Sequence, residues 1–126
     1  MPKLSLALLF FVMGQGPEVV SRTEYTLRVE NFFQFQPLHA GKPSQFRIEL
    51  KDVSDDSHIK GAQVTLTVRR VGTLQPVTTA STRPDKASGI YLTSLTIPAA
   101  GTYTIEFRIK NGKFDERMLV DFFEVE

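Results

Sequence analysis

Residues 101–110 alternate strictly between apolar and polar side chains, and no other segment constrains the fold as strongly. Tyr103, Ile105, Phe107 and Ile109 share one side of this segment, and polar residues occupy the other. This period of two predicts a β-strand with one face in a core and one face in water. The segment opens with Gly-x-Tyr after a turn, which is typical of a β-sandwich corner where a tyrosine hydroxyl bonds back to the backbone. We therefore expect Tyr103 to make such a bond.

Six further segments have the composition of strands, and clusters of turn residues separate them. The seven expected strands are residues 23–33, 44–52, 62–71, 76–81, 89–97, 102–110 and 114–125. Their spacing of roughly ten residues predicts an all-β fold, a seven-stranded antiparallel immunoglobulin-like β-sandwich. Asn111-Gly112 between the last two strands predicts a tight hairpin in which both central residues have positive φ.

The same alternation predicts which side chains form the core. The residues expected to point inward, apart from the four already named, are Phe46, Ile48, Leu50, Ala62, Val64, Leu66, Val68, Tyr91, Thr93, Leu95 and Ile97. Two registers fit the last strand equally well. One buries Met118, Val120 and Phe122, and the other buries Leu119, Phe123 and Val125.

Length and composition exclude several classes of protein. A chain of 126 residues is long enough for one domain with a real core. It has no cysteine, which excludes disulfides, thiolate metal sites and an acylated cysteine. Its formal net charge is +1 with acids and bases interspersed, so it has no basic stripe for nucleic acid.

The N-terminal segment has the pattern of an export signal. Lys3 is followed by an apolar run at residues 4–13, which is too short to span a bilayer. We expect residues 1–21 to be a signal peptide and residues 22–126 to be the mature domain, without a membrane span, in the periplasm. Cleavage after Gly16 is an alternative to cleavage after Ser21, and an extra buried strand is the alternative to a signal.

Four segments together resemble one known module. They are residues 35–46, residues 59–66, the Ser-Gly-Ile-Tyr at 88–91 and the Ala-Gly-Thr-Tyr at 100–103. In this order they are similar to the N-terminal β-sandwich domain of periplasmic adaptor (membrane fusion) proteins from heavy-metal RND efflux systems. The resemblance covers about residues 24–126, nearly the whole expected mature chain.

This resemblance implies a domain that binds a protein partner, such as a subunit of an efflux assembly. The family commonly has acidic residues around its aromatic pair, whereas this chain has Gln34 and Gln36. The lipoyl-like, barrel and α-hairpin parts of an adaptor have no counterpart here. We therefore expect either a free-standing relative of the module or a truncated adaptor.

Two histidines and one methionine are the candidate metal ligands. His39 and His58 lie in predicted loops, and with Met118 they would form a site for Zn or Cu if the fold brought them together. The alternative is that both histidines are ordinary exposed loop residues. Asp52, together with the acidic residues that follow it, is expected to close a backbone turn more readily than to hold Ca²⁺.

The aromatic residues near the two ends of the domain are the candidate partner surface. Alternation cannot bury both members of an adjacent Phe pair on one sheet face, so one member of each pair is either exposed or covered by a loop. The candidate contact residues are Phe32, Phe33, Phe35 and Phe123. Burial under an edge strand is the alternative.

No residue pattern indicates catalysis. The chain lacks a Gly-x-Ser-x-Gly motif, a glycine-rich phosphate loop and a dinucleotide motif. We therefore expect a non-enzymatic binding or interaction module with no required cofactor. The alternatives are a small periplasmic metal-binding or metal-delivery protein and a structural domain of a surface or secreted assembly.

Overall fold

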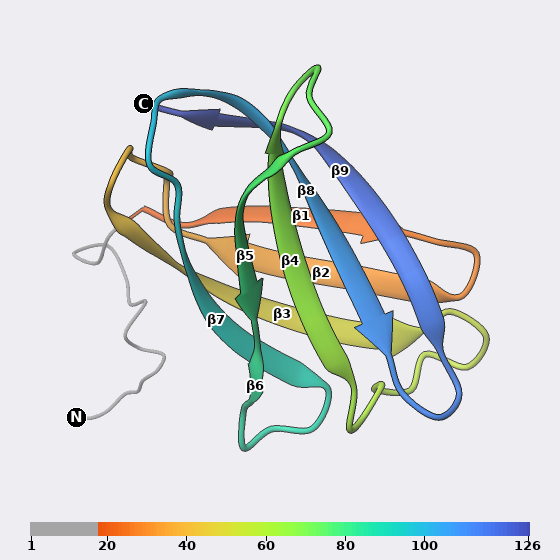
Figure 1. Ribbon diagram of the computed structural model, residues 1–126. Helices are drawn as coiled ribbons and strands as arrows, with labels where there is room; N and C mark the ends of the chain where they lie inside the picture. Colours follow the sequence, from red (N-terminus) through yellow and green to blue (C-terminus); the bar gives the residue numbers. More distant parts are fainter. Residues whose placement is uncertain (1–17) are drawn as a thin grey trace, which may run out of the picture.

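A computed structural model describes residues 18–126, and every regular element in this part of the chain is a β-strand (Figure 1). Residues 18–126 contain no helix long and apolar enough to cross a membrane. Residues 4–13, the apolar run of the expected signal peptide, lie outside the described residues.

Within residues 18–126, nine strands form two antiparallel sheets. In chain order they are β1 (Val20–Tyr25), β2 (Val29–Phe35), β3 (Pro43–Asp52), β4 (Gln63–Arg70), β5 (Pro76–Ser81), β6 (Arg83–Pro84), β7 (Ile90–Thr96), β8 (Gly101–Lys110) and β9 (Asp115–Val125). One sheet has the order β1-β2-β3-β7-β6, and the other has the order β5-β4-β8-β9. The all-β, two-sheet prediction is confirmed, but the predicted number of seven strands is wrong.

The number is wrong mainly because residues 23–33 form a hairpin and not one strand. β1 and β2 pair antiparallel around a turn that contains no Gly, Pro or Asn. The Thr26 hydroxyl accepts hydrogen bonds from the backbone N–H groups of Arg28 (3.1 Å) and Val29 (3.0 Å), and this local bonding stabilises the turn. The other additional strand is the two-residue β6, which pairs with β7.

The inward-facing prediction is confirmed for the central strands. Phe46, Ile48 and Leu50 of β3 are buried, and so are the predicted apolar positions of β4 and β8, while Ala62 before β4 is partly buried. In β7 the predicted Tyr91 and its alternate neighbours are buried as well. Burying each large apolar side chain stabilises the fold by roughly 1.5–3 kcal/mol, so this layer supplies most of the driving force.

A β-bulge resolves the register of β9. Tyr103 pairs with Phe123, whereas Ile105 pairs with Val120, so two residues of β9 oppose the single residue Thr104 of β8. The bulge reverses the alternation, and as a result Met118, Val120, Phe123 and Val125 are buried while Phe122 is exposed. Each of the two expected registers is therefore correct for one half of the strand.

Two tyrosines join strands to neighbouring backbone. The Tyr103 hydroxyl donates to the carbonyl oxygen of Ala99 at 2.7 Å, which confirms the predicted corner. The Tyr91 hydroxyl donates to the carbonyl of Ile59 at 2.7 Å and accepts from the N–H of Ala62 at 3.0 Å. All three hydrogen bonds hold loop backbone against the core.

The β8–β9 hairpin is confirmed, but its turn differs from the prediction. The connection is the four residues 111–114, and neither Asn111 nor Gly112 has a positive φ. The Asn111 side-chain oxygen instead accepts hydrogen bonds from the N–H groups of Lys113 and Phe114, both at 2.8 Å. The side chain of Asn111, and not a left-handed backbone, closes this turn.

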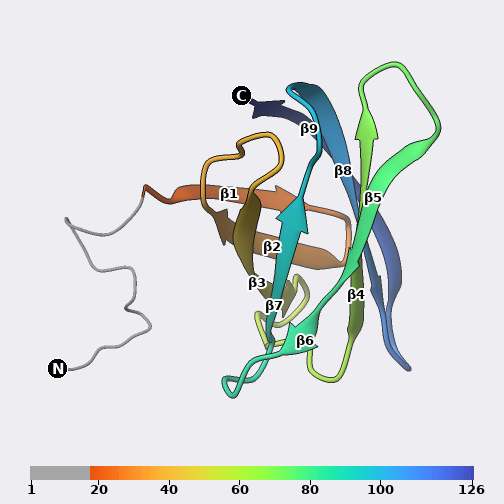
Figure 2. The same cartoon turned by 60° about the vertical axis from the view of Figure 1, so that its left-hand side comes forward.

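The two long sides of the sandwich are closed differently. On one side the chain passes from β5 through Thr82 into β6, and so crosses from one sheet to the other (Figure 2). On the opposite side the edge strands β1 and β9 face each other without a chain connection between them. This second side contains the candidate site.

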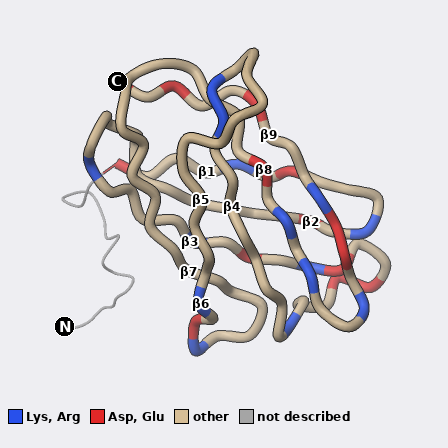
Figure 3. Tube along the Cα trace, viewed as in Figure 1, with Lys and Arg blue, Asp and Glu red and all other residues tan. Residues whose placement is uncertain are grey.

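Charge is distributed unevenly over the strands. Charged residues gather along β8 and β9 and in the loops beside their hairpin, whereas β5 and β7 carry none (Figure 3). On the outer face of β4 and β8, Arg69 donates to Glu106 at 2.8 Å, and Arg117 of β9 bonds the other oxygen of Glu106 at 3.4 Å. The hydrogen bond from Arg69 lowers the pKa of Glu106.

Candidate functional site

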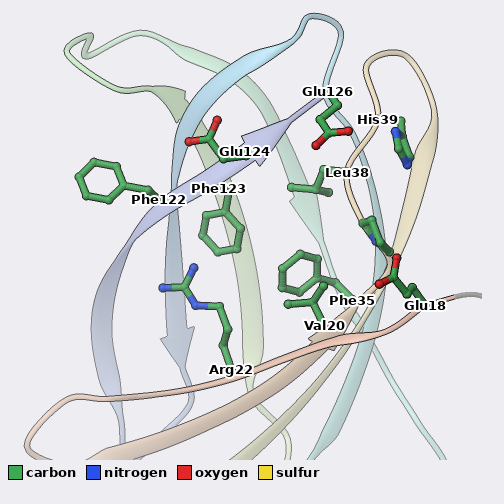
Figure 4. Close-up of a pocket in the computed structure, with 11 residues that line it drawn as sticks. Glu18, Val20, Arg22, Phe35, Leu38, His39, Phe122, Phe123, Glu124 and Glu126 are labelled. Atoms are coloured by element: carbon green, nitrogen blue, oxygen red, sulfur yellow. The ribbon is translucent and has the colours of Figure 1, made fainter.

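A groove of about 390 Å³ lies between the edge strands β1 and β9 (Figure 4). We call it the β1–β9 groove. Val20 and Arg22 line it from β1, and Phe122 and Phe123 line it from β9. Glu124 of β9 also lines it, and the remaining lining residues come from the end of β2, the β2–β3 loop and the two ends of the described chain: Glu18, Phe35, Pro37, Leu38, His39 and Glu126.

Core aromatic rings form the floor of the groove. The Phe35 ring stacks on Phe46 with centroids 4.9 Å apart and planes 7° apart, and it packs against Phe123 at 5.6 Å. Phe33 lies next to both Phe35 (6.0 Å) and Phe123 (6.3 Å). These contacts fix the rings on several sides, so the floor is rigid and apolar.

Arg22 connects the two edges. Its guanidinium lies 4.8 Å from the centre of the Phe123 ring, donates to the backbone carbonyl of Asp121 and pairs with Glu24 at 3.0 Å. Arg22 therefore satisfies one backbone carbonyl on the free edge of β9. Its positive charge is neutralised by Glu24, its neighbour on β1.

The upper end of the groove is closed by the β2–β3 loop. Leu38 pairs in parallel with Val125, the Glu126 N–H donates to the Leu38 carbonyl at 3.1 Å, and the Ala40 N–H donates to the Glu126 carbonyl at 2.8 Å. Backbone of the same chain thus already covers the last residues of β9.

The rim of the groove is acidic. Three carboxylates, those of Glu18, Glu124 and Glu126, line it against the single guanidinium of Arg22. The Thr102 hydroxyl lies 2.9 Å and 3.1 Å from the two carboxylate oxygens of Glu124 and orients that group. Exposed His39 is the other titratable side chain of the rim.

Phe122 contributes to a second hollow on the outer face of the β5-β4-β8-β9 sheet. This hollow of about 500 Å³ is bordered by the β4–β5 loop with Leu74, and by Leu119 and Phe122 of β9. All three side chains are largely exposed, with Phe122 63% exposed. Phe122 therefore lies between two concave surfaces.

The predicted Phe surface is corrected by this geometry. Phe33, Phe35 and Phe123 are buried in the core, and Phe32 is half-buried on the outer face of β2. The rule that one member of an adjacent pair is exposed holds for β9, but the exposed member is Phe122. Phe35 and Phe123 still contribute to the candidate site because their rings line its floor.

His39, His58 and Met118 do not form one site. His39 lies in the loop before β3, while His58 pairs with Lys51 near the end of β3. Ten residues of extended strand hold the two loops ~30 Å apart. The structure therefore does not bring the predicted metal ligands together in one site.

His58 and Met118 each have a different polar neighbour. The Nε2 of His58 lies 3.1 Å from a carboxylate oxygen of Glu49. The sulfur of Met118 is buried and accepts a hydrogen bond from the side-chain amide of Asn31 at 3.6 Å. Within residues 18–126, no group of three or more His, Cys, Asp or Glu side chains is arranged to hold a metal ion.

The acidic loop after β3 closes its own turns, as predicted. A carboxylate oxygen of Asp52 accepts from the hydroxyl (2.7 Å) and N–H (2.9 Å) of Ser54, and the other oxygen accepts from Lys113 at 3.1 Å. These bonds, led by the Ser54 hydroxyl, lower the pKa of Asp52 to about 2. Asp55 has the same arrangement with Ser57, whose hydroxyl lowers the pKa of Asp55.

Sequence reasoning missed Phe122, Arg22 and Glu124 as groove residues. The adjacent Phe122-Phe123 pair was the available signal, because one of the two had to leave the core face. Comparisons of the chain with protein-family models, with curated proteins and with solved structures found no match.

Proposed function

We propose that this chain is an exported, non-catalytic interaction module with an immunoglobulin-like sandwich fold. The β1–β9 groove carries the proposal, because it combines two edge strands, a rigid aromatic floor and the exposed ring of Phe122. An apolar concave surface beside an exposed aromatic residue is the usual form of a protein-binding site.

The fold assignment is supported by two antiparallel sheets and by the Tyr103 corner. Export is supported by the apolar run at residues 4–13 after Lys3, and we propose the periplasm as the location. The sequence resemblance to heavy-metal RND adaptors makes a subunit of an efflux assembly the class of partner that we propose.

In vivo photo-crosslinking tests this function. The residue p-benzoylphenylalanine is introduced in place of Phe122 and, as the control, in place of Leu27, which is more exposed but lies in the β1–β2 turn. A discrete covalent adduct at position 122 and none at position 27 supports an interaction module, and mass spectrometry of the adduct identifies the partner. Equal adducts at both positions, or none, would reject the proposal.

A further inference from the structure

We infer that the partner binds as an extended segment that adds a strand to the free edge of β1 and places apolar and basic side chains in the β1–β9 groove. This inference rests on the proposed function and specifies the chemistry of the partner. It follows from the different protection of the two edges, the shape of the groove and the charge on its rim.

β9 is a protected edge. It contains a bulge, its Asp121 carbonyl is bonded by Arg22, and its last residues pair with the β2–β3 loop. Bulges and covered backbone groups are devices that prevent an edge strand from pairing with another chain.

Within residues 18–126, the free edge of β1 has neither a bulge nor a hydrogen-bonded backbone group. Its six residues contain no Pro, no Gly and no Lys, and it has no register shift against β2. Its charges, Arg22 and Glu24, are paired with each other at 3.0 Å. An edge strand of this kind presents unpaired backbone groups to an incoming extended chain.

A strand added to β1 would place alternate side chains on the groove side. Val20 lies on that side of β1 and lines the groove, and successive residues of an added strand would alternate in the same way. Those side chains would lie over the Phe35 and Phe123 rings of the floor, and Phe122 borders the groove on the β9 side (Figure 4). Apolar anchors are therefore expected at every second position of the segment.

The carboxylates at the rim of the groove favour a binding segment with positive charge. Glu18, Glu124 and Glu126 surround the groove, and the one guanidinium, Arg22, already has Glu24 as its partner. Lys or Arg flanking the apolar anchors would complement these carboxylates. A second copy of this chain would instead oppose acidic rim to acidic rim, so we assign the groove to a different chain.

The test uses the full chain and a designed peptide, Lys-Lys-Val-Thr-Phe-Thr-Val-Lys-Lys, followed by amide-resolved NMR and hydrogen exchange. We expect shifts in β1 and around Phe122, and slower exchange at those β1 amides that do not bond to β2. The analogue with Glu in place of every Lys should bind about tenfold more weakly at low salt.

Two N-methylated analogues test the backbone pairing. In an added strand the N–H groups of alternate residues face the protein, so methylation of one set blocks pairing while methylation of the other set leaves it intact. Methylation of the Val and Phe residues and methylation of the Thr residues must therefore have unequal effects. Equal effects would show that no strand is added.

A pair of charge variants tests the rim. Glu124→Lys should weaken binding of the Lys peptide about fivefold, whereas Glu30→Lys, the same charge change on the outer face of β2, should leave binding unchanged. No shifts at millimolar peptide, equal binding of the Glu analogue, or shifts that arise from self-association in sedimentation would each overturn the inference. An adduct at position 122 without peptide binding would leave the proposed function intact and reject only the added strand.

Discussion

The hydroxyl of Tyr103 donates a hydrogen bond to the carbonyl oxygen of Ala99, 2.7 Å away. The same hydroxyl accepts from the guanidinium of Arg70 at 3.1 Å, and that guanidinium also donates to the Ala100 carbonyl. One oxygen at the start of β8 thus fixes both the β7–β8 turn and the end of β4.

Replacing Tyr103 by Phe should lower the free energy of unfolding by about 1–2 kcal/mol, because the Ala99 carbonyl and Arg70 both lose a partner. Tyr25→Phe is the matched control, since Tyr25 is exposed and should change stability by less than about 0.5 kcal/mol. Urea unfolding of the two variants measures the difference. Equal stabilities would mean that the corner bond contributes nothing.

The two adjacent phenylalanines of β9 should respond oppositely to truncation. Phe123→Ala removes a core ring and should destabilise by about 3–5 kcal/mol. Phe122→Ala should change stability by less than about 0.5 kcal/mol while abolishing binding at the β1–β9 groove. Thermal unfolding and peptide titration separate these effects. A strongly destabilised Phe122→Ala protein would contradict the assignment of Phe122 to the surface.

Acid should destabilise the fold through Asp52. Its pKa is lowered to about 2 in the folded state, so its contribution to stability is fully present above the unfolded pKa of about 3.9 and is lost as pH falls toward 2. Asp52→Asn should therefore flatten the pH dependence of unfolding between pH 4 and 2.

Ser54→Ala should raise the pKa of Asp52 more than Lys113→Gln does, because the Ser54 hydroxyl is the larger cause. An NMR titration of the Asp52 carboxyl carbon measures the pKa in each variant. A larger rise in Lys113→Gln than in Ser54→Ala would contradict this prediction.

Gly89 should be far less tolerant of substitution than Gly112. Gly89 has a φ of +79°, and a Cβ at that position would lie 2.6 Å from the Cβ of His58. Gly89→Ala should therefore destabilise by about 1–3 kcal/mol. Gly112 has no positive φ and open space around it, so Gly112→Ala should be close to neutral. Chemical denaturation of both variants is the measurement, and similar losses would show that the backbone at Gly89 relaxes freely.

The residue at which the chain begins should affect stability. Val20 and Ser21 pair with Phe35 and Gln34 in the β1–β2 ladder. A chain that begins at Pro17 keeps β1 complete, whereas a chain that begins at Arg22 loses two of its paired positions. The shorter chain should be less stable by about 1 kcal/mol. Identical unfolding curves would mean that the first two residues of β1 contribute no stability.

Strand positions and inward faces were predictable wherever local alternation is clean. In β4, β8 and the middle of β3 the apolar residues face the core and the polar residues alternate with them, so a period of two was sufficient. The ends of β3 depart from this rule, because polar Ser44 and Asp52 are buried. Tyr103 was predictable because the Gly-x-Tyr step after a turn leaves its hydroxyl near the backbone that it follows.

The predictions failed at turns that are closed by a side-chain hydrogen bond and not by a Gly or Pro backbone conformation. The turn between β1 and β2 depends on the hydroxyl of Thr26, and the β8–β9 turn depends on the side-chain oxygen of Asn111. The bulge at Phe122 could not be seen from β9 alone, because it exists only relative to the pairing of Thr104 on β8. The distance between His39 and His58 depends on the length and direction of β3. The number of residues between the two histidines does not predict that distance.

The passage of the chain from β5 through Thr82 into β6 has a mechanical consequence. Covalent backbone ties the sheets together on that side, whereas on the opposite side side-chain contacts such as that of Arg22 and the short pairing at Leu38 hold them. When the two layers separate transiently, they will part first at the β1–β9 side and pivot about the β5–β6 side. The part of the molecule that is easiest to open is thus also the part at which we propose that a partner binds.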